Sequence, residues 1–412
     1  MFAAKSTRTR VGKWEKRVQF GEVKRYNAFH PAKVWLDNNG RHINAHGGGG
    51  FIFEGGKYYM FGEHKLGGVL GNRSVVGVRC YASSDLYNWE DLGIVLKMSD
   101  NPDSKIFIGT VVERPKVLFN KRTGKYVMFF HIESRRDKTA RNPNLDVIEK
   151  ERPNYSTAMI GFAVADKISG PYEFVKAQRL HAGILPQNAS KELVDLVKSG
   201  KGKEPPSFGG VSKKGGTPND TFAKYFSEGQ FSRDFTAFLD DDGKGYIISA
   251  SLDNSSLIVS ELDETFLGFT GKYTLNFEGK YHEAPALFKI GGKYYMFSSH
   301  CTGWAPNAGR VSVADSIFGE WKELGNPCRG KGQSATKFSQ SAEADTTFRS
   351  QSTAVIKVEG KDNAFIFVGD RWNPKDAIDG RYIFLPVEWE NGTPVIYWRD
   401  KWDLSFFDKK PE

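Results

Sequence analysis

One heptapeptide, GGKYYMF, occurs twice in the chain, at residues 55–61 and again at 291–297. Two copies of seven identical residues indicate a repeated structural unit rather than chance. In each copy two glycines precede a run of β-favouring residues, and glycine supplies the positive φ that a hairpin turn requires. The repeat therefore predicts a chain built from recurring β-hairpins.

Three further segments share this pattern of a turn followed by residues that favour strands. They are TGKYVMF at 123–129, DGKGYII at 242–248 and KDNAFIF at 361–367. All five hairpins follow an apolar strand, and several are trailed by a segment with an aspartate, a turn, an aromatic residue and a further strand. Four short strands repeated five times predict an all-β fold, a five-bladed β-propeller, because radial packing hides the edges of the sheets. A β-sandwich uses similar strands but does not need five copies of one hairpin.

The longest interval between hairpins separates the second from the third, which indicates an insertion at about residues 181–231. Within it, SKELVDLVK predicts a short helix with Ser190 as N-cap and Gly200 at its end, and the remainder is predicted to be polar loop. Such an insertion is either a lid over a binding site or a decoration. We assign residues 40–407 to the propeller and residues 1–39 to an N-terminal extension or strand that closes it.

The composition is that of a folded chain, with 39% hydrophobic residues and 44 glycines among 412. No apolar run is long enough to span a bilayer, and no signal peptide is visible at the start, so we expect no membrane partner. Three cysteines without metal-ligand spacing predict neither a disulfide framework nor a zinc site.

The net charge is +9, with basic residues gathered at 135–141 and 191–214. Nucleic-acid binding needs a basic stripe interleaved with stacking aromatics, and these runs contain few aromatics. We therefore expect no nucleic-acid partner, whereas an acidic substrate is compatible with this charge.

Three carboxylates precede the hairpin turns at equivalent positions of the repeat: Glu113 in VVERPKVLF, Asp234 in FSRDFTAFLDDDG and Glu283 in YHEAPALFK. The symmetry of a propeller would bring them together near its axis. Each acid taken alone could be structural, bonded to Arg114, Arg233 or nearby backbone. Three acids at matching positions favour a functional site, because Glu and Asp seldom occupy buried positions unless they are partnered or functional.

Other polar and aromatic residues lie at matching places in the repeat. His46 precedes the first inner strand and Gln351 the fifth, while Trp304 and Trp372 lie in loops after hairpins, where tryptophans stack on sugar rings or cap the core. The predicted substrate-binding residues are His46, Glu63, Arg233, Trp304, Arg371 and Trp372. A group of carboxylates with such platforms is typical of glycoside hydrolysis, in which one acid protonates the leaving oxygen.

The ordered motifs extend over most of the chain and, taken together, resemble glycoside hydrolase family 43, within it the exo-β-1,3-galactanase-like subgroup. The motifs are NAHGGG, ERPKV, SRDFTAFLDDDGK, EAPALFK, TGWAPN, SQST and GDRWNP. The resemblance implies a five-bladed β-propeller, in agreement with the repeat count, and inverting hydrolysis of glycosidic bonds. It implies no cofactor and no metal ligand set, although a structural cation near the axis, beside His46, is compatible with the fold.

In this resemblance Glu283 matches the general acid, and Asp234 matches the residue that orients the acid and raises its pKa. The family's usual base is an aspartate at the start of blade one, where residues 44–47 read NAHG. The galactanase-like subgroup shares this absence and carries Glu and Gln at the positions of Glu113 and Gln351. Gln351 is thus implied to position the water, as an imidic tautomer or as a hydrogen-bonding guide, and Glu113 to bind substrate hydroxyls or act as base.

The implied function is exo-acting release of terminal galactose from β-1,3-galactan, the backbone of arabinogalactan, by a secreted or periplasmic enzyme whose partner is an oligo- or polysaccharide. One alternative is an α-L-arabinofuranosidase or β-galactofuranosidase, as in neighbouring subgroups. Another is a non-catalytic propeller that binds carbohydrate, which the missing blade-one aspartate favours. A third is a propeller that binds protein, but it would have no use for the aligned axial acids.

Overall fold

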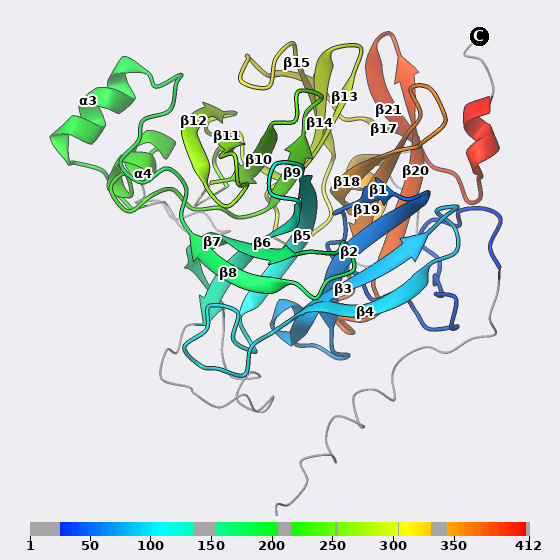
Figure 1. Cartoon of the computed structure of the whole chain (residues 1–412). Helices are drawn as coiled ribbons and strands as arrows, with labels where there is room; N and C mark the ends of the chain where they lie inside the picture. The colour runs from blue at the N-terminus through cyan, green and yellow to red at the C-terminus, as the bar shows by residue number, and fades with distance from the viewer. Residues whose placement is uncertain are drawn as a thin grey trace, which may run out of the picture.

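Five sheets surround a common axis as the blades of a β-propeller (Figure 1), which confirms the predicted fold. This computed structural model describes residues 25–135, 153–204, 216–251, 254–303, 305–330 and 344–408.

Each blade contains four consecutive antiparallel strands, and blade five gains one short strand at its outer edge. Blade one contains β1 (Ile52–Glu54), β2 (Lys57–Lys65), β3 (Val75–Ser83) and β4 (Glu90–Lys97). Blade two contains β5 (Val111–Asn120), β6 (Lys125–Arg135), β7 (Pro153–Ala165) and β8 (Glu173–Gln178). Blade three contains β9 (Phe235–Leu239), β10 (Gly245–Ala250), β11 (Leu257–Leu262) and β12 (Phe269–Asn276). Blade four contains β13 (His282–Ile290), β14 (Lys293–His300), β15 (Arg310–Ala314) and β16 (Lys322–Gly325). Blade five contains β18 (Gln351–Lys357), β19 (Phe365–Arg371), β20 (Arg381–Glu390) and β21 (Thr393–Tyr397), with β17 (Cys328–Arg329) parallel to β21.

The repeated heptapeptide forms the hairpin between the first two strands of blades one and four. Gly291 and Gly292 turn the chain with φ of 58° and 77° between the paired residues Ile290 and Lys293. Positive φ at both turn positions matches the twist of the flanking strands, which explains the two glycines. The predicted hairpins of the other three blades are also present.

Apolar side chains fill the spaces between consecutive blades. Phe61 and Val112 pack between blades one and two, Phe129 and Phe235 between two and three, and Ile248 and Met296 between three and four. The largest cluster joins blades four, five and one, where the ring of Phe288 lies 5.1 Å from that of Phe365. The polar ends of the inner strands are therefore held at the axis by a core that surrounds it.

The insertion packs on β12, the outer strand of blade three (Figure 1), where Asn188 Nδ2 donates to the Leu275 carbonyl at 2.6 Å. The predicted helix is present as α3 (Lys191–Ser199), capped by the Ser190 hydroxyl and ended by Gly200. The prediction of loop for the remainder was wrong at α4 (Pro218–Lys224), which Thr217 and Asp220 start with a capping box.

The N-terminal segment meets the C-terminal end of the propeller where Phe29 and Trp402 form an antiparallel bridge and their rings stack at 4.5 Å. Phe29 belongs to the segment predicted to close the ring, and that role and the boundaries at 39 and 407 stay predictions. Over the described ranges, no helix is long and apolar enough to cross a membrane.

Phe288→Ala is expected to lower the free energy of unfolding by about 3–5 kcal/mol, because a buried ring between blades four and five is lost. Phe53→Ala is the matched control. Its ring is 43% exposed, so the expected loss is about 1 kcal/mol or less. Urea denaturation of both variants measures the difference in the free energy of unfolding. Equal losses would show that the interface between blades four and five does not stabilise the propeller.

Candidate active site

A pocket of about 450 Å³ opens at one end of the axis and takes residues from all five blades. Every predicted site residue outside Trp304 lines it, and Trp304 lies outside the described residues. The roles of these residues stay predictions.

A β-bulge directs the acids of blades two and four into the pocket. Glu113-Arg114-Pro115 and Glu283-Ala284-Pro285 share one pattern, and the pairing register shifts at both places. Arg114 and Ala284 both have φ of 53°, and the proline that follows has no N–H to lose from the ladder. The bulge bends the inner strand at the same point in each blade and thereby re-aims the glutamate.

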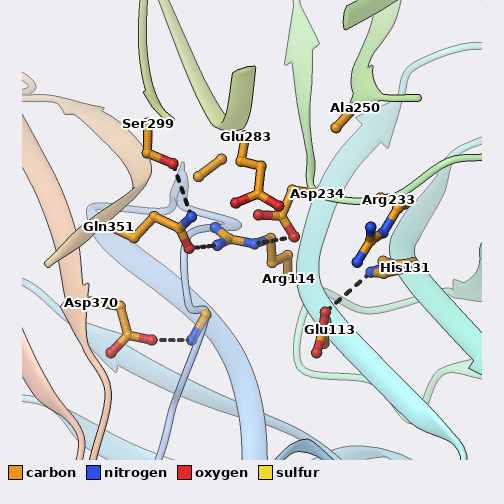
Figure 2. A network of polar contacts seen from close by, with 12 residues as sticks. Glu113, Arg114, His131, Arg233, Asp234, Ala250, Glu283, Ser299, Gln351 and Asp370 are labelled. Atoms are coloured by element: carbon orange, nitrogen blue, oxygen red, sulfur yellow. Dashed lines mark hydrogen bonds and ion pairs between the residues drawn. The ribbon is translucent and has the colours of Figure 1, made fainter. Parts of the chain in front are cut away.

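Glu283 and Asp234 approach each other from neighbouring blades (Figure 2). Burial raises the pKa of Glu283 to about 7, and the charge of Asp234 adds to the shift against the guanidiniums of Arg233 and Arg114. Asn254 Nδ2 donates to Glu283 Oε1 at 2.5 Å, which leaves Oε2 as the oxygen that can carry the proton. Glu283 is therefore a carboxylic acid able to donate a proton near neutral pH.

Arg114 links four blades around this pair. Its Nε lies 3.0 Å from Asp234 Oδ1, its Nη1 donates to the Ser352 carbonyl at 3.1 Å, and its Nη2 donates to Gln351 Oε1 (Figure 2). Its backbone N–H donates to Glu63 Oε1 at 2.9 Å. The surrounding carboxylates outweigh burial and raise the pKa of Arg114, so it keeps its charge.

Gln351 is fixed at both ends of its amide, because Nε2 donates to Ser299 Oγ at 2.9 Å while Oε1 accepts from Arg114. These bonds match the ordinary amide form and leave one N–H and one lone pair. Of the two roles open from the sequence, the geometry favours the hydrogen-bonding guide.

Glu113 is held as an acceptor on the opposite side of the pocket from Gln351. Asn72 Nδ2 donates to its Oε1, and His131 Nδ1 lies 3.1 Å from its Oε2 (Figure 2). Burial would raise the pKa of Glu113, but His131, Lys65 and Arg114 together lower it to about 2. A carboxylate this acidic suits the binding of hydroxyls better than the removal of a proton.

Blade one contributes a tightly packed corner at the start of its inner strand. His46 Nδ1 lies 2.7 Å from Asp370 Oδ2, and the Gly47 N–H donates to the same oxygen at 2.6 Å. Glu63 lines the pocket, with its oxygens bonded to the Arg114 N–H and to Lys65 Nζ at 3.0 Å. It supports Arg114, and its predicted contact with substrate stays a prediction.

Blade five contributes Arg371 and the half-buried Trp372, which line the pocket beside the segment after β2. Arg371 Nη2 donates to the Phe348 carbonyl at 2.5 Å, and burial together with Arg349 and Arg381 lowers the pKa of Arg371 to about 10. A Cβ at Gly71 would lie 3.4 Å from the Trp372 ring, so the two loops touch.

A metal ion does not fit this arrangement. Ligand atoms of Glu113, His131 and Asp234 come within 4.8 Å of one another, but Arg114 already neutralises Asp234 and His131 faces a second carboxylate. Beside His46, burial would raise the pKa of Asp370, but His46, the Gly47 N–H and the charge of Lys65 together lower it. Protein cations thus take the place that a structural cation would need, and we assign no step to a metal.

Several residues of the site were not predicted from the sequence: Asn72, Arg349 and Asn254 line the pocket, and His131 and Ser299 hold groups that do. Asn72 lies in the short 3-10 helix η1 (Gly71–Ser74) and Asn254 in an irregular segment, both between strands, where the repeat gives no position to compare. His131 was detectable, because it pairs directly with Glu113 across the hairpin.

Comparison with known proteins gives one family. The model of the glycosyl hydrolases family 43 matches residues 213–394. A solved family 43 β-1,3-galactosidase with galactodeoxynojirimycin is 39% identical, with 91% of this chain and 100% of that one covered and a TM-score of 0.77. A second such β-1,3-galactosidase is 32% identical over 93% of this chain and 65% of its own, with a TM-score of 0.71. An exo-β-1,3-galactanase variant from Phanerochaete chrysosporium, solved with β-1,3-galactotriose, is 27% identical over 92% and 68%, with a TM-score of 0.65. Among curated proteins no match was found.

A five-bladed propeller whose axial pocket sets a protonatable glutamate beside a second carboxylate defines a glycoside hydrolase. The chain belongs to glycoside hydrolase family 43, as its identity over the full length of the first of these structures shows.

Gly47→Ala is expected to reduce kcat/KM strongly, because a Cβ there would lie 2.2 Å from Glu63 Oε1 and displace the support of Arg114. Gly55→Ala is a matched control, since its φ of 58° is almost the same as the 59° of Gly47 but nothing lies within 4 Å. Both variants carry the backbone strain of about 1–2 kcal/mol. Hydrolysis rates and thermal unfolding separate the two effects, and equal activity in the two variants would argue against the role of Glu63.

Proposed function

We propose that this enzyme is an exo-acting, inverting glycoside hydrolase that releases terminal galactose from β-1,3-galactan, such as the backbone of arabinogalactan. The observation that carries the proposal is the buried Glu283, protonated near neutral pH and facing Asp234 in a pocket to which all five blades contribute. A pocket at the end of the axis accepts the end of a chain more readily than its middle. Similarity to β-1,3-galactosidases and exo-β-1,3-galactanases supports the choice of sugar and linkage.

In this mechanism Glu283 Oε2 gives its proton to the glycosidic oxygen as the bond to C1 breaks, and a water on the other face of the sugar bonds to C1. Gln351 guides that water with the lone pair and N–H left by Arg114 and Ser299. Glu113 accepts hydrogen bonds from sugar hydroxyls. The water loses one proton to solvent, and solvent returns one to Glu283 after the products leave.

The indole of Trp372 would stack on sugar rings, together with that of Trp304, which the sequence predicts to bind substrate. Arg233 and Arg371, both lining the pocket, would bind hydroxyls or orient a carboxylate. Because polysaccharides do not cross membranes, the proposal also implies that the enzyme acts in a secreted or periplasmic setting.

Incubation of the purified protein with β-1,3-galacto-oligosaccharides is expected to release free galactose and to shorten the chain one unit at a time. Aryl arabinofuranosides and galactofuranosides are the comparison substrates. Cleavage of a furanoside alone would change the proposed substrate but leave the proposed mechanism unchanged. If none of these substrates is cleaved, the result would favour a propeller that binds carbohydrate without cleaving it.

Glu283→Gln is expected to lower kcat on the oligosaccharides about 10²–10⁴-fold, because general acid catalysis is lost. In the wild-type enzyme kcat/KM should fall as the pH rises through about 7, since the active form of Glu283 is protonated and loses its proton there. That alkaline limb should be absent from the variant's profile. A variant with near-normal turnover would remove Glu283 from the role of acid.

A further inference from the structure

A buried histidine lies between two glutamates beneath the pocket. His131 Nδ1 is 3.1 Å from Glu113 Oε2, and His131 Nε2 is 2.7 Å from Glu133 Oε1. His131 and Glu133 are neighbours on one face of β6, two residues apart, and His131 pairs with Glu113 on β5. His131 is 1% exposed and Glu133 is 0% exposed, so neither meets solvent.

Two ionised carboxylates can each accept a hydrogen bond from the ring only if both ring nitrogens carry a proton. A neutral imidazole has one N–H, and its other nitrogen would direct a lone pair at a carboxylate oxygen. Burial alone would lower the pKa of His131, but the charges of Glu133 and Glu113 outweigh it and raise the pKa to about 9. The ring is therefore an imidazolium at neutral pH.

Other charged side chains also act on the two glutamates that contact His131. Arg233 Nε lies 3.8 Å from Glu133 Oε1, and Lys65 and Arg114 act on Glu113 from blades one and two. Burial raises the pKa of Glu133 to about 7 in spite of His131 and Arg233. His131 contacts both glutamates, one at each ring nitrogen.

We propose that His131 and Glu133 are positioning residues that keep Glu113 ionised and aimed into the pocket, so that Glu113 receives substrate hydroxyls rather than a proton. This inference rests on the proposed function. Glu133 fixes the protonated state and orientation of the ring, and the ring in turn fixes Glu113. The bonds from Asn72 and His131 each leave a lone pair on the Glu113 oxygens for the substrate.

The first test needs no substrate. In the wild-type protein, NMR of ¹⁵N-labelled histidine should show His131 protonated up to a pH of about 9. Glu133→Gln should shift this titration to lower pH, because the neutral amide no longer stabilises the imidazolium. A neutral His131 ring at pH 7 in the wild-type protein would overturn the proposal, whatever the substrate of the enzyme proves to be.

The second test follows the acid limb of kcat/KM with β-1,3-galacto-oligosaccharides. His131→Asn retains a donor near Glu113 but removes the positive charge. In this variant the pKa of Glu113 should rise, so that the acid limb moves to higher pH. We expect kcat/KM of His131→Asn at pH 5 to fall about tenfold, while the alkaline limb of Glu283 stays in place. KM should rise more than kcat falls, because hydroxyl binding is what weakens.

Asp91→Asn is the matched control. Asp91 is a half-buried carboxylate bonded to Arg79 at 2.5 Å in blade one, and it does not line the pocket. Its loss should lower stability without moving the acid limb. An acid limb that stays in place in His131→Asn, with activity lost only in proportion to stability, would reduce His131 to a structural role and overturn the proposal.

Discussion

The guanidinium of Arg114 is the interaction on which the pocket depends. Five blades bring carboxylates to one axis, where they would repel one another and resist burial unless a positive charge lies among them. Arg114 supplies that charge, and its planar fork reaches blade three at Asp234 and blade five at Gln351 and Ser352 at once. Its backbone N–H is bonded to Glu63 of blade one. Contacts from four blades therefore fix the position of the charge.

Around this charge the fold gives two glutamates opposite chemistry. Glu113 and Glu283 occupy the same bulge in two blades, and both are buried. Glu113 lies near an imidazolium and a lysine, which lower its pKa, whereas Glu283 lies near Asp234, which raises its pKa. The same backbone geometry therefore supplies a fixed anion on one side of the pocket and a proton donor on the other, and the neighbours alone make the difference.

Much of this arrangement could be predicted from the sequence because it repeats. The hairpin signature revealed five blades, and the equivalent positions of Glu113, Asp234 and Glu283 revealed a shared pocket. What could not be predicted depends on contacts between segments that share no repeat. Asn254 reaches Glu283 from an irregular loop. Glu63 accepts a hydrogen bond from the backbone N–H of Arg114, which is available to it because of the bulge at that residue. The helix α4 was overlooked because its capping box begins in a run of glycines and lysines that otherwise favours loop.

The identical heptapeptide of blades one and four has a meaning for how such a chain diversifies. GGKYYMF builds the turn and the second strand, and its side chains pack against the neighbouring blades in the same way in both places. The residues that differ chemically, His46 in one blade and Glu283 in the other, lie at the opposite end of the inner strand, outside the heptapeptide. A duplicated blade can therefore keep the sequence that folds it while acquiring a new group at the axis. The residues that form the hairpin and the residues that face the pocket lie in separate parts of one repeat.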